Sequence, residues 1–265
     1  MSEQEHLDIF TTPDGKSRLL WGAQVVTSAP QLAELAIRIG FDTVWIEMEH
    51  ASTSFETAEW MCHAIESVGG VPTIRVSDDQ RTHVLRALEV GARIVVVPMI
   101  NTVEQARNIV KYGKFAPLGA RGFNRGSRGL EQAQYDVSIS FPRANARTHL
   151  FAQIETTEAV KNLDEICTVE GLSGIFVGPG DLSASMGCPG NMDDPNLIEC
   201  ATDCIRRARK AGKLAGILTG PGALLESAVE AGCNFCISVS DLGAARTVWA
   251  QNLSTVKAIE KSKRK

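Results

Sequence analysis

The sequence repeats one pattern eight times, in which a short apolar run precedes or follows a longer stretch with helical periodicity. The short runs are apolar at both odd and even positions, which is typical of parallel strands buried on both faces. Most helical stretches end on a glycine, as helices often do before the chain turns into the next strand. We expect strands at residues 18–26, 42–48, 71–77, 93–100, 149–156, 172–179, 213–219 and 234–240.

Eight strand–helix units in about 250 residues predict an α/β protein with a single-domain (β/α)8 TIM barrel. The alternative is a doubly wound open sheet. It is disfavoured because no GxGxxG follows the first strand, where the sequence reads "VVTSAPQ". We predict a polar N-terminal segment at residues 1–17 and the barrel at residues 18–265, with no linker that divides the chain.

Composition excludes several classes of function. The formal net charge of −4 and the scattered basic residues argue against nucleic-acid binding. The N-terminus lacks a targeting pattern and no apolar run approaches the length of a membrane span, so we expect a soluble cytoplasmic protein. The 7 cysteines are scattered, including the "CNFC" at Cys233–Cys236, and are interpreted as reduced core thiols rather than disulfides or a metal motif.

One connection, residues 113–148, is long and rich in Gly, Arg and Pro. Long loops in compact domains are usually functional or disordered, and we expect this one to rise over the catalytic face of the barrel. Its "GARG" suggests Arg121 as a contact to the distal part of a substrate.

In a TIM barrel, chemistry takes place at the C-terminal ends of the strands. Four of the expected strands end in polar groups, although burying an ionisable group costs several kcal/mol unless it is paired or metal-bound. These groups are Glu47, Glu49 and His50, then Arg75, then Gln153 and Glu155, and then Gly178 to Asp181.

Glu155 and Asp181 are hard oxygen donors at the ends of neighbouring strands. Two carboxylates, completed by water or substrate oxygens, are the usual ligands of Mg²⁺ or Mn²⁺. The alternative is that each carboxylate accepts hydrogen bonds from loop amides. The backbone at Gly180 and Asp181 also suits a substrate carboxylate, because exposed N–H groups before a helix bind anions.

Arg75 keeps its charge, so at a barrel mouth it would stabilise an oxygen that becomes negative during reaction. Its alternative role is an ion pair with Glu47 or Glu49. The lysines fall in helices, in loops or, for Lys213, at the start of a strand, which argues against a Schiff-base aldolase and favours a metal as the electron sink.

The motifs "WIEMEHA", "TIRV", "QIET" and "GPGDLS", followed by "GIL", resemble in order and spacing the HpcH/HpaI aldolase family over residues 18–255. The resemblance implies a class II pyruvate aldolase that uses Mg²⁺, Mn²⁺ or Co²⁺ and no organic cofactor. It also implies a homohexamer with the last helix exchanged between subunits. The substrates would be a 2-oxo acid and an aldehyde.

Carried over by motif, the resemblance makes Glu155 and Asp181 the metal ligands and Arg75 the group that stabilises the enolate oxygen. His50 would be the base, acting through a water on the metal. Contacts to the pyruvate part would come from Gln153, Gly180 and Leu218.

The sequence departs from the family at two aspartates, which are replaced by Glu47 and Glu89. The family pattern favours Glu47 as the residue that orients His50, whereas strand alternation puts Glu47 and Glu49 on the same side and does not distinguish them. Glu89 closes a helix that runs away from the catalytic face, so its role would need a neighbouring subunit; alternatively it is a surface charge.

Trp45 in "VWIEMEH" resembles a tryptophan that lines the site of macrophomate synthase, a member of the same family; alternatively it fills the core. Three further functions stay open at this point. They are coupling of an oxaloacetate-derived enolate to an acceptor, acyl-CoA lysis like that of the citrate lyase β-subunit, and metabolite binding without catalysis.

Overall fold

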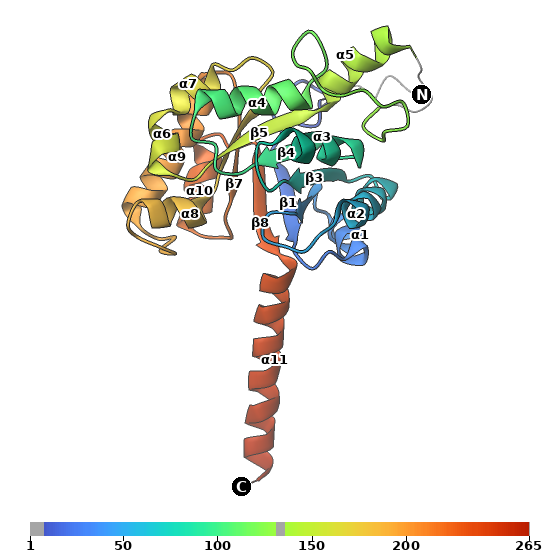
Figure 1. Ribbon diagram of the computed structural model, residues 1–265. Helices are drawn as coiled ribbons and strands as arrows, with labels where there is room; N and C mark the ends of the chain where they lie inside the picture. Colours follow the sequence, from blue (N-terminus) through green and yellow to red (C-terminus); the bar gives the residue numbers. More distant parts are fainter. Residues whose placement is uncertain (1–7, 131–135, 265) are drawn as a thin grey trace.

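The computed structural model describes residues 8–130 and 136–264. In this part of the chain eight parallel strands close into a barrel in sequence order, and β1 pairs with β8 (Figure 1). The (β/α)8 prediction is therefore confirmed, and the open sheet is excluded. The strands are β1 (Leu20–Val25), β2 (Thr43–Glu47), β3 (Val71–Arg75), β4 (Ile94–Val97), β5 (His149–Ile154), β6 (Gly174–Val177), β7 (Leu214–Leu218) and β8 (Phe235–Ser240).

Helices follow every strand. They begin at local signals that the sequence carries, such as the Ser54 cap of α2 and the capping box of Thr102 and Gln105 at α4. None of the described helices is both long and apolar enough to cross a bilayer. The helices are α1 (Pro30–Ile39), α2 (Phe55–Ser67), α3 (Arg81–Glu89), α4 (Val103–Gly113), α5 (Val137–Arg147), α6 (Thr157–Lys161), α7 (Leu163–Cys167), α8 (Pro179–Ser185), α9 (Pro195–Lys210), α10 (Ala223–Glu230) and α11 (Asp241–Lys263).

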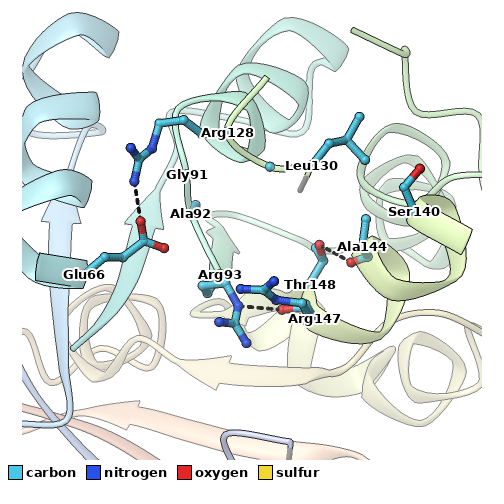
Figure 2. A pocket seen from close by; sticks show the side chains of 11 residues that line it. Glu66, Gly91, Ala92, Arg93, Arg128, Leu130, Ser140, Ala144, Arg147 and Thr148 are labelled. Atoms are coloured by element: carbon cyan, nitrogen blue, oxygen red, sulfur yellow. Dashed lines mark hydrogen bonds and ion pairs between the residues drawn. The ribbon is translucent and has the colours of Figure 1, made fainter. Parts of the chain in front are cut away.

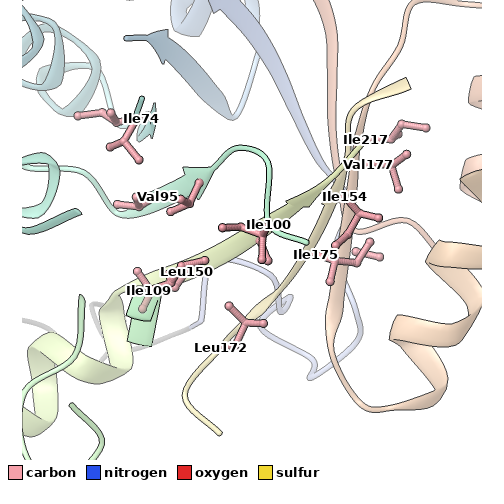
Figure 3. Packing of buried hydrophobic residues seen from close by; sticks show 14 of the residues in the cluster. Ile74, Val95, Ile100, Ile109, Leu150, Ile154, Leu172, Ile175, Val177 and Ile217 are labelled. Atoms are coloured by element: carbon pink, nitrogen blue, oxygen red, sulfur yellow. The ribbon is translucent and has the colours of Figure 1, made fainter. Parts of the chain in front are cut away.

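Two apolar layers hold the barrel together. Outward-facing strand residues such as Val95, Leu150 and Ile175 pack against the surrounding helices (Figure 3). Inward-facing aromatic residues fill the barrel; they include Trp45 and Phe176, whose ring centroids are 4.8 Å apart. Because β4 and its neighbours are buried on both faces, their apolar residues show no alternation.

The N-terminal end of the barrel is closed by Phe10, which precedes β1 and is only 2% exposed. Its ring lies 5.0 Å from that of His149 and 5.9 Å from that of Phe151, measured between centroids. Residues 8–17 thus contribute to the barrel core. The predicted domain boundary at residue 17 stays a prediction, and residues 1–7 lie outside the described range.

The connection from residue 113 to 148 lies at the N-terminal end of the barrel, so the prediction that it covers the catalytic face is wrong. It joins the end of α4 to the start of β5, and helices in this fold run antiparallel to the strands. It contains α5, anchored by a stacked Phe115–Phe141 pair with centroids 4.1 Å apart. Lys114 donates hydrogen bonds to the carbonyl oxygens of Asn145, in α5, and of Thr148, directly after it. Residues 131–135 lie outside the described part of the connection.

Helix α11 does not pack along the barrel. It extends from the end of β8 into solvent, at the end of the molecule opposite α5 (Figure 1). None of its residues is buried, although it carries large apolar side chains such as Val248, Trp249 and Leu253.

Candidate active site

A cavity of about 320 Å³ opens at the C-terminal end of the barrel. Nine of the predicted site residues meet there, brought from strands that are far apart in the sequence. Those nine are Trp45, Glu47, His50, Arg75, Gln153, Glu155, Gly180, Asp181 and Leu218; Gln24, Val26, Phe176, Gly178 and Pro179 complete the lining.

Glu47 is the most highly connected side chain of this cavity. It is 1% exposed, and its Oε2 accepts hydrogen bonds from Gln24 Nε2 at 2.9 Å and Trp45 Nε1 at 3.0 Å. Its Oε1 accepts the backbone N–H groups of Glu49 and His50 at 2.7 and 3.0 Å. Glu47 therefore fixes the turn that leaves β2 and holds the ring of Trp45 in place.

Arg75 pairs with both carboxylates of the β2 segment. Its two terminal nitrogens lie 2.6 Å from Glu47 Oε2 and 3.0 Å from Glu49 Oε2. The ion pair considered as an alternative role for Arg75 thus exists, and Arg75 lines the cavity as well. Burial alone would raise the pKa of Glu47, but the Arg75 charge and the hydrogen bonds outweigh it and lower that pKa.

The carboxylate near the His50 imidazole belongs to Glu49, whose Oε2 lies 3.6 Å from His50 Nε2. Glu47 instead accepts a hydrogen bond from the backbone N–H of His50. Burial raises the pKa of Glu49, with the Arg75 charge acting in the opposite direction. The geometry therefore distinguishes two residues that strand alternation leaves equivalent.

Glu155 is the second buried carboxylate of the cavity, with 1% exposure. Its Oε1 accepts the backbone N–H of Met99 at 2.7 Å, and its Oε2 accepts Gln153 Nε2. Burial raises the pKa of Glu155, and the neighbouring Asp181 carboxylate adds to the rise, against the Met99 and Gln153 hydrogen bonds. A positive charge between Glu155 and Asp181 would relieve this electrostatic cost.

The donor set around Glu155 suits a hard divalent cation. Gln153 Oε1 is buried and accepts no hydrogen bond from the described residues, which leaves an oxygen available to a ligand. A Cβ at Gly178 would lie 2.5 Å from Glu155 Oε2, so the glycine keeps the space beside this carboxylate open. The described residues hold no cluster of three or more His, Cys, Asp or Glu placed for a metal. Mg²⁺ and Mn²⁺ sites commonly use only one or two carboxylates, completed by water and substrate.

One part of the cavity wall is apolar. Trp45 is fully buried, and together with Phe176, Leu218 and Val26 it forms this wall. Trp45 is therefore core filler and cavity lining at once, because its ring lies where the barrel interior meets the mouth. Such a wall excludes water and strengthens electrostatic interactions at the polar side.

Glu89 and Arg121 do not line this cavity. Glu89 ends α3, and Arg121 follows α4, so both lie toward the N-terminal end of the barrel. Arg121 is buried with its guanidinium 4.7 Å from the centre of the Phe115 ring. Burial lowers the pKa of Arg121 to about 10, and the Glu89 carboxylate opposes that shift. The two residues thus interact electrostatically with each other.

Sequence reasoning missed Gln24, which lines the cavity, and Met99, which holds Glu155 from outside the lining. Gln24 has a readable signal, since it is the one amide in the apolar run "LLWGAQVV". Met99 has no such signal: its φ of 55° turns its N–H toward Glu155, and nothing in "VVPMIN" indicates a left-handed residue.

The fold and the cavity define an enzyme class: a TIM barrel with buried carboxylates, an arginine and an imidazole at its C-terminal mouth. Comparison with known proteins makes the class specific. The HpcH/HpaI aldolase/citrate lyase family model matches residues 21–243, and the chain belongs to this family. It is accordingly a carbon–carbon lyase of the aldolase type.

Among its relatives is the 2-keto-3-deoxy-L-rhamnonate aldolase of Klebsiella pneumoniae, 34% identical over 215 residues, which are 81% of this chain and 80% of the relative. The crystal structure of an HpcH/HpaI aldolase from Desulfitobacterium hafniense superposes with a TM-score of 0.85 and 26% identity, covering 91% of this chain and 93% of that one. Macrophomate synthase shares the fold, with a TM-score of 0.76 and 23% identity over 92% of this chain and 85% of that chain.

Proposed function

We propose that this protein is a divalent-metal-dependent pyruvate aldolase that cleaves or forms the C3–C4 bond of a 4-hydroxy-2-oxo acid. The observation that carries the proposal is the juxtaposition of Glu155, Asp181, Arg75 and His50 around one cavity with an apolar wall. Aldolases of this family are generally metal-dependent. Glu155 and Asp181 are the residues that would hold the cation, which supplies Lewis-acid polarisation of the 2-oxo group when bound.

The chain's own groups supply binding and charge stabilisation. The N–H groups of Gly180 and Asp181 lie in the first turn of α8, and in this proposal they bind the substrate carboxylate. Arg75, fixed by Glu47 and Glu49, stabilises the negative charge that develops on the oxygen of the enolate. Because Arg75 is already held in place, little reorganisation is needed during the reaction.

His50 is the proposed proton-transfer group. Cleavage requires removal of the proton from the 4-hydroxyl, and the C3 carbon is protonated as pyruvate forms. The imidazole is exposed at the mouth and lies 3.6 Å from Glu49 Oε2. In this arrangement Glu49 orients the imidazole, and Glu47 positions the backbone from which it projects.

The cavity favours an aldehyde without a second carboxylate. Arg75 is the one cationic Arg or Lys among the described residues that line the cavity, and Glu47 and Glu49 already pair with it. A neutral hydroxyaldehyde therefore fits better than an acidic semialdehyde. The name of the Klebsiella relative, a 2-keto-3-deoxy-L-rhamnonate aldolase, agrees with this choice.

The test is a pyruvate-release assay with 2-keto-3-deoxy sugar acids and with a 4-hydroxy-2-oxo diacid as the acidic counterpart. Each substrate is assayed after EDTA treatment and again after addition of Mg²⁺, Mn²⁺ or Co²⁺. We expect metal-dependent pyruvate release with the neutral-tailed substrates at the higher kcat/KM. No pyruvate with any substrate and any metal would refute the proposal, whereas a preference for the diacid would refute only the substrate choice.

We further propose that α11 packs against a second copy of the chain. Its exposed apolar residues Trp249, Leu253 and Val256 have helical spacing, and exposed patches of this kind mark protein interfaces. On the barrel, α1 exposes Leu35 and Ile39 next to the sector that α11 leaves uncovered. Exchange of α11 between copies would cover both surfaces. A hexamer, implied by family resemblance, is the assembly we propose.

Sedimentation of the wild type and of a Trp249→Asp/Leu253→Asp variant tests this assembly. We expect a single large species for the wild type and smaller species for the variant; a monomeric wild type would contradict the proposal. Arg264→Gln, at an exposed helix end, is the control. We also propose a cytoplasmic location. None of the seven cysteines forms a disulfide, which supports this location.

A further inference from the structure

Gln24 is the one polar side chain on the side of the candidate active site that β7, β8 and β1 form, among the described residues that line it. Its neighbours there are Val26, which directly follows β1, and Leu218, which ends β7. Gln24 faces the barrel interior, because Ala23 and Val25 on either side of it pack outward against the helices. The aldolase reaction proposed above assigns no role to this amide.

The amide of Gln24 has a fixed orientation. Its Nε2 donates a hydrogen bond to Glu47 Oε2 at 2.9 Å. An ionised carboxylate only accepts hydrogen bonds, so the NH₂ side of the amide must face Glu47 and the carbonyl side must point away from it. The same carboxylate oxygen accepts a hydrogen bond from Trp45 Nε1 at 3.0 Å and pairs with Arg75 at 2.6 Å. Gln24 is thus tied to side chains that are themselves held in place.

The amide oxygen of Gln24 has no hydrogen-bond partner among the described residues. The single hydrogen bond of this side chain is the one that Nε2 donates to Glu47. The oxygen is not enclosed by protein, since Gln24 is half-buried and lines the cavity. An amide oxygen accepts hydrogen bonds and repels carboxylate oxygens. This position therefore selects a ligand that donates a hydrogen bond, such as a hydroxyl group.

The barrel places Gln24 across the cavity from the proposed cation ligands. Because the strands close in sequence order, β1 lies opposite β5, and Gln24 and Glu155 lie on opposite sides of the cavity. In the proposed reaction the carboxylate and 2-oxo groups of the substrate lie near Glu155 and Asp181. The 4-hydroxyl lies near His50, which follows β2, the neighbour of β1. The substrate chain beyond C4 then runs toward the side on which Gln24 lies.

We infer that Gln24 is a specificity-determining residue that accepts a hydrogen bond from a hydroxyl group beside the reacting carbon, on the aldehyde-derived part of the substrate. The inference rests on the proposed aldolase function and names the side chain that selects a hydroxyaldehyde. A substrate without this hydroxyl leaves the amide oxygen to water. Because Gln24 is only half-buried, water replaces the lost partner in part, and we expect about tenfold discrimination from this one hydrogen bond.

The test is the addition of pyruvate to glycolaldehyde and to propanal, in which a methyl group replaces the hydroxyl, by the full-length protein with Mn²⁺. We expect Gln24→Met, which keeps the size of the side chain and removes the amide, to lower the ratio of kcat/KM for glycolaldehyde over propanal about tenfold. Loss of support for Glu47 alone would lower both rates and leave the ratio unchanged. Gln31→Met, at an exposed position of α1, is the matched control and should keep the wild-type ratio.

A second variant makes the test independent of how well Gln24→Met folds. Gln24→Lys keeps a hydrogen-bond donor for Glu47 but has no acceptor, so the same ratio should fall as in Gln24→Met. The inference is overturned if either variant, once folded, keeps the wild-type ratio, or if Gln31→Met lowers the ratio equally. No product from the wild type with either aldehyde would refute the proposed aldolase function, and this inference with it. A normal rate with an unchanged ratio refutes the role of Gln24 alone.

Discussion

The two ends of the barrel differ in charge and in what closes them. At the C-terminal end, Glu47, Glu155 and Asp181 gather around a single arginine and an open cavity. At the N-terminal end, Phe10 closes the barrel interior and arginines gather beside it. Parallel strands cause this separation, because residues before a strand and residues after it lie at opposite ends. Arg93 and Met99 flank β4 in this way and therefore lie at opposite ends of the barrel.

The two ends of the barrel also differ in what they contribute to stability and to chemistry. At the C-terminal end, burial raises the pKa of Glu155. At the N-terminal end, the aromatic plug formed by Phe10 and Phe151 fills the barrel interior. We therefore expect replacement of Glu155 to affect activity and replacement of the aromatic plug to affect folding. Glu47 belongs to a buried ion pair, so its replacement should affect stability as well. Four substitutions at the two ends test that division.

Replacing Glu155 with glutamine should lower kcat/KM for pyruvate release about a thousandfold, because one of the two proposed cation ligands is lost. Calorimetric titration with Mn²⁺ should show the same loss of binding. Far-UV circular dichroism should be unchanged. Glu158→Gln, on the exposed first turn of α6, is the matched control. Full Mn²⁺ affinity in Glu155→Gln would contradict the assignment.

Replacing Phe10 with alanine should lower the free energy of unfolding by about 3–5 kcal/mol, since it removes a buried ring from the aromatic cluster. Urea denaturation measures the change. The kcat of the folded fraction should stay close to that of the wild type. Phe123→Ala is the control, because that ring is 47% exposed. A large fall in kcat with unchanged stability would break the proposed division between the two ends.

Glu47 links the ion-pair network to pH. Its pKa is lowered in the folded protein, so its contribution to stability is present above the ordinary value of 4.5 and is lost as the pH falls through the folded-state pKa. Glu47→Gln should lower the free energy of unfolding by about 3 kcal/mol at pH 7, because Arg75 loses a buried partner. The difference from the wild type should shrink on acidification below pH 4.5, as followed by urea denaturation. A pH-independent difference would argue against the ion pair as its origin.

Substitutions of Met99 test whether its backbone conformation positions Glu155, and we expect their effect to be small. A β-branched residue is disfavoured at its φ of 55°, so Met99→Val should cost about 1–2 kcal/mol and misplace the N–H that holds Glu155. We expect about a fivefold loss in kcat/KM and weaker Mn²⁺ binding in calorimetry. Met99→Gly keeps the backbone conformation and should retain both. Equal behaviour of the two variants would show that the left-handed turn does not position Glu155.

The sequence predicts the barrel well because its signal is local and repeated. Each buried strand is an apolar run in the sequence, and each of the eight expected ranges contains one of the eight strands of the structure. The site is predictable to a similar degree, since polar residues that end buried strands must converge in a closed parallel barrel. This logic brings Trp45, Arg75 and Glu155 into one cavity.

The sequence does not predict the position of a connection between elements, or which of two nearby side chains makes a contact. Residues 113–148 follow a helix that runs antiparallel to the strands, so they lie at the N-terminal end of the barrel. Arg121 is in this connection and therefore lies away from the cavity where it was predicted to contact the substrate. The choice between Glu47 and Glu49 depends on side-chain rotamers around Arg75, which sequence spacing does not specify.

By itself, the sequence determined the number and order of the strands, the buried aromatic and apolar core, and the residue types at the mouth of the barrel. These properties depend on periodicity and hydrophobicity, which short segments carry on their own. Which carboxylate faces His50 and how Met99 turns toward Glu155 depend on the folded chain. The same holds for the meeting of Arg93, Arg128 and Arg147 at one cavity near the N-terminal end of the barrel (Figure 2). These outcomes depend on contacts between segments far apart in the chain, whose geometry is set by barrel closure.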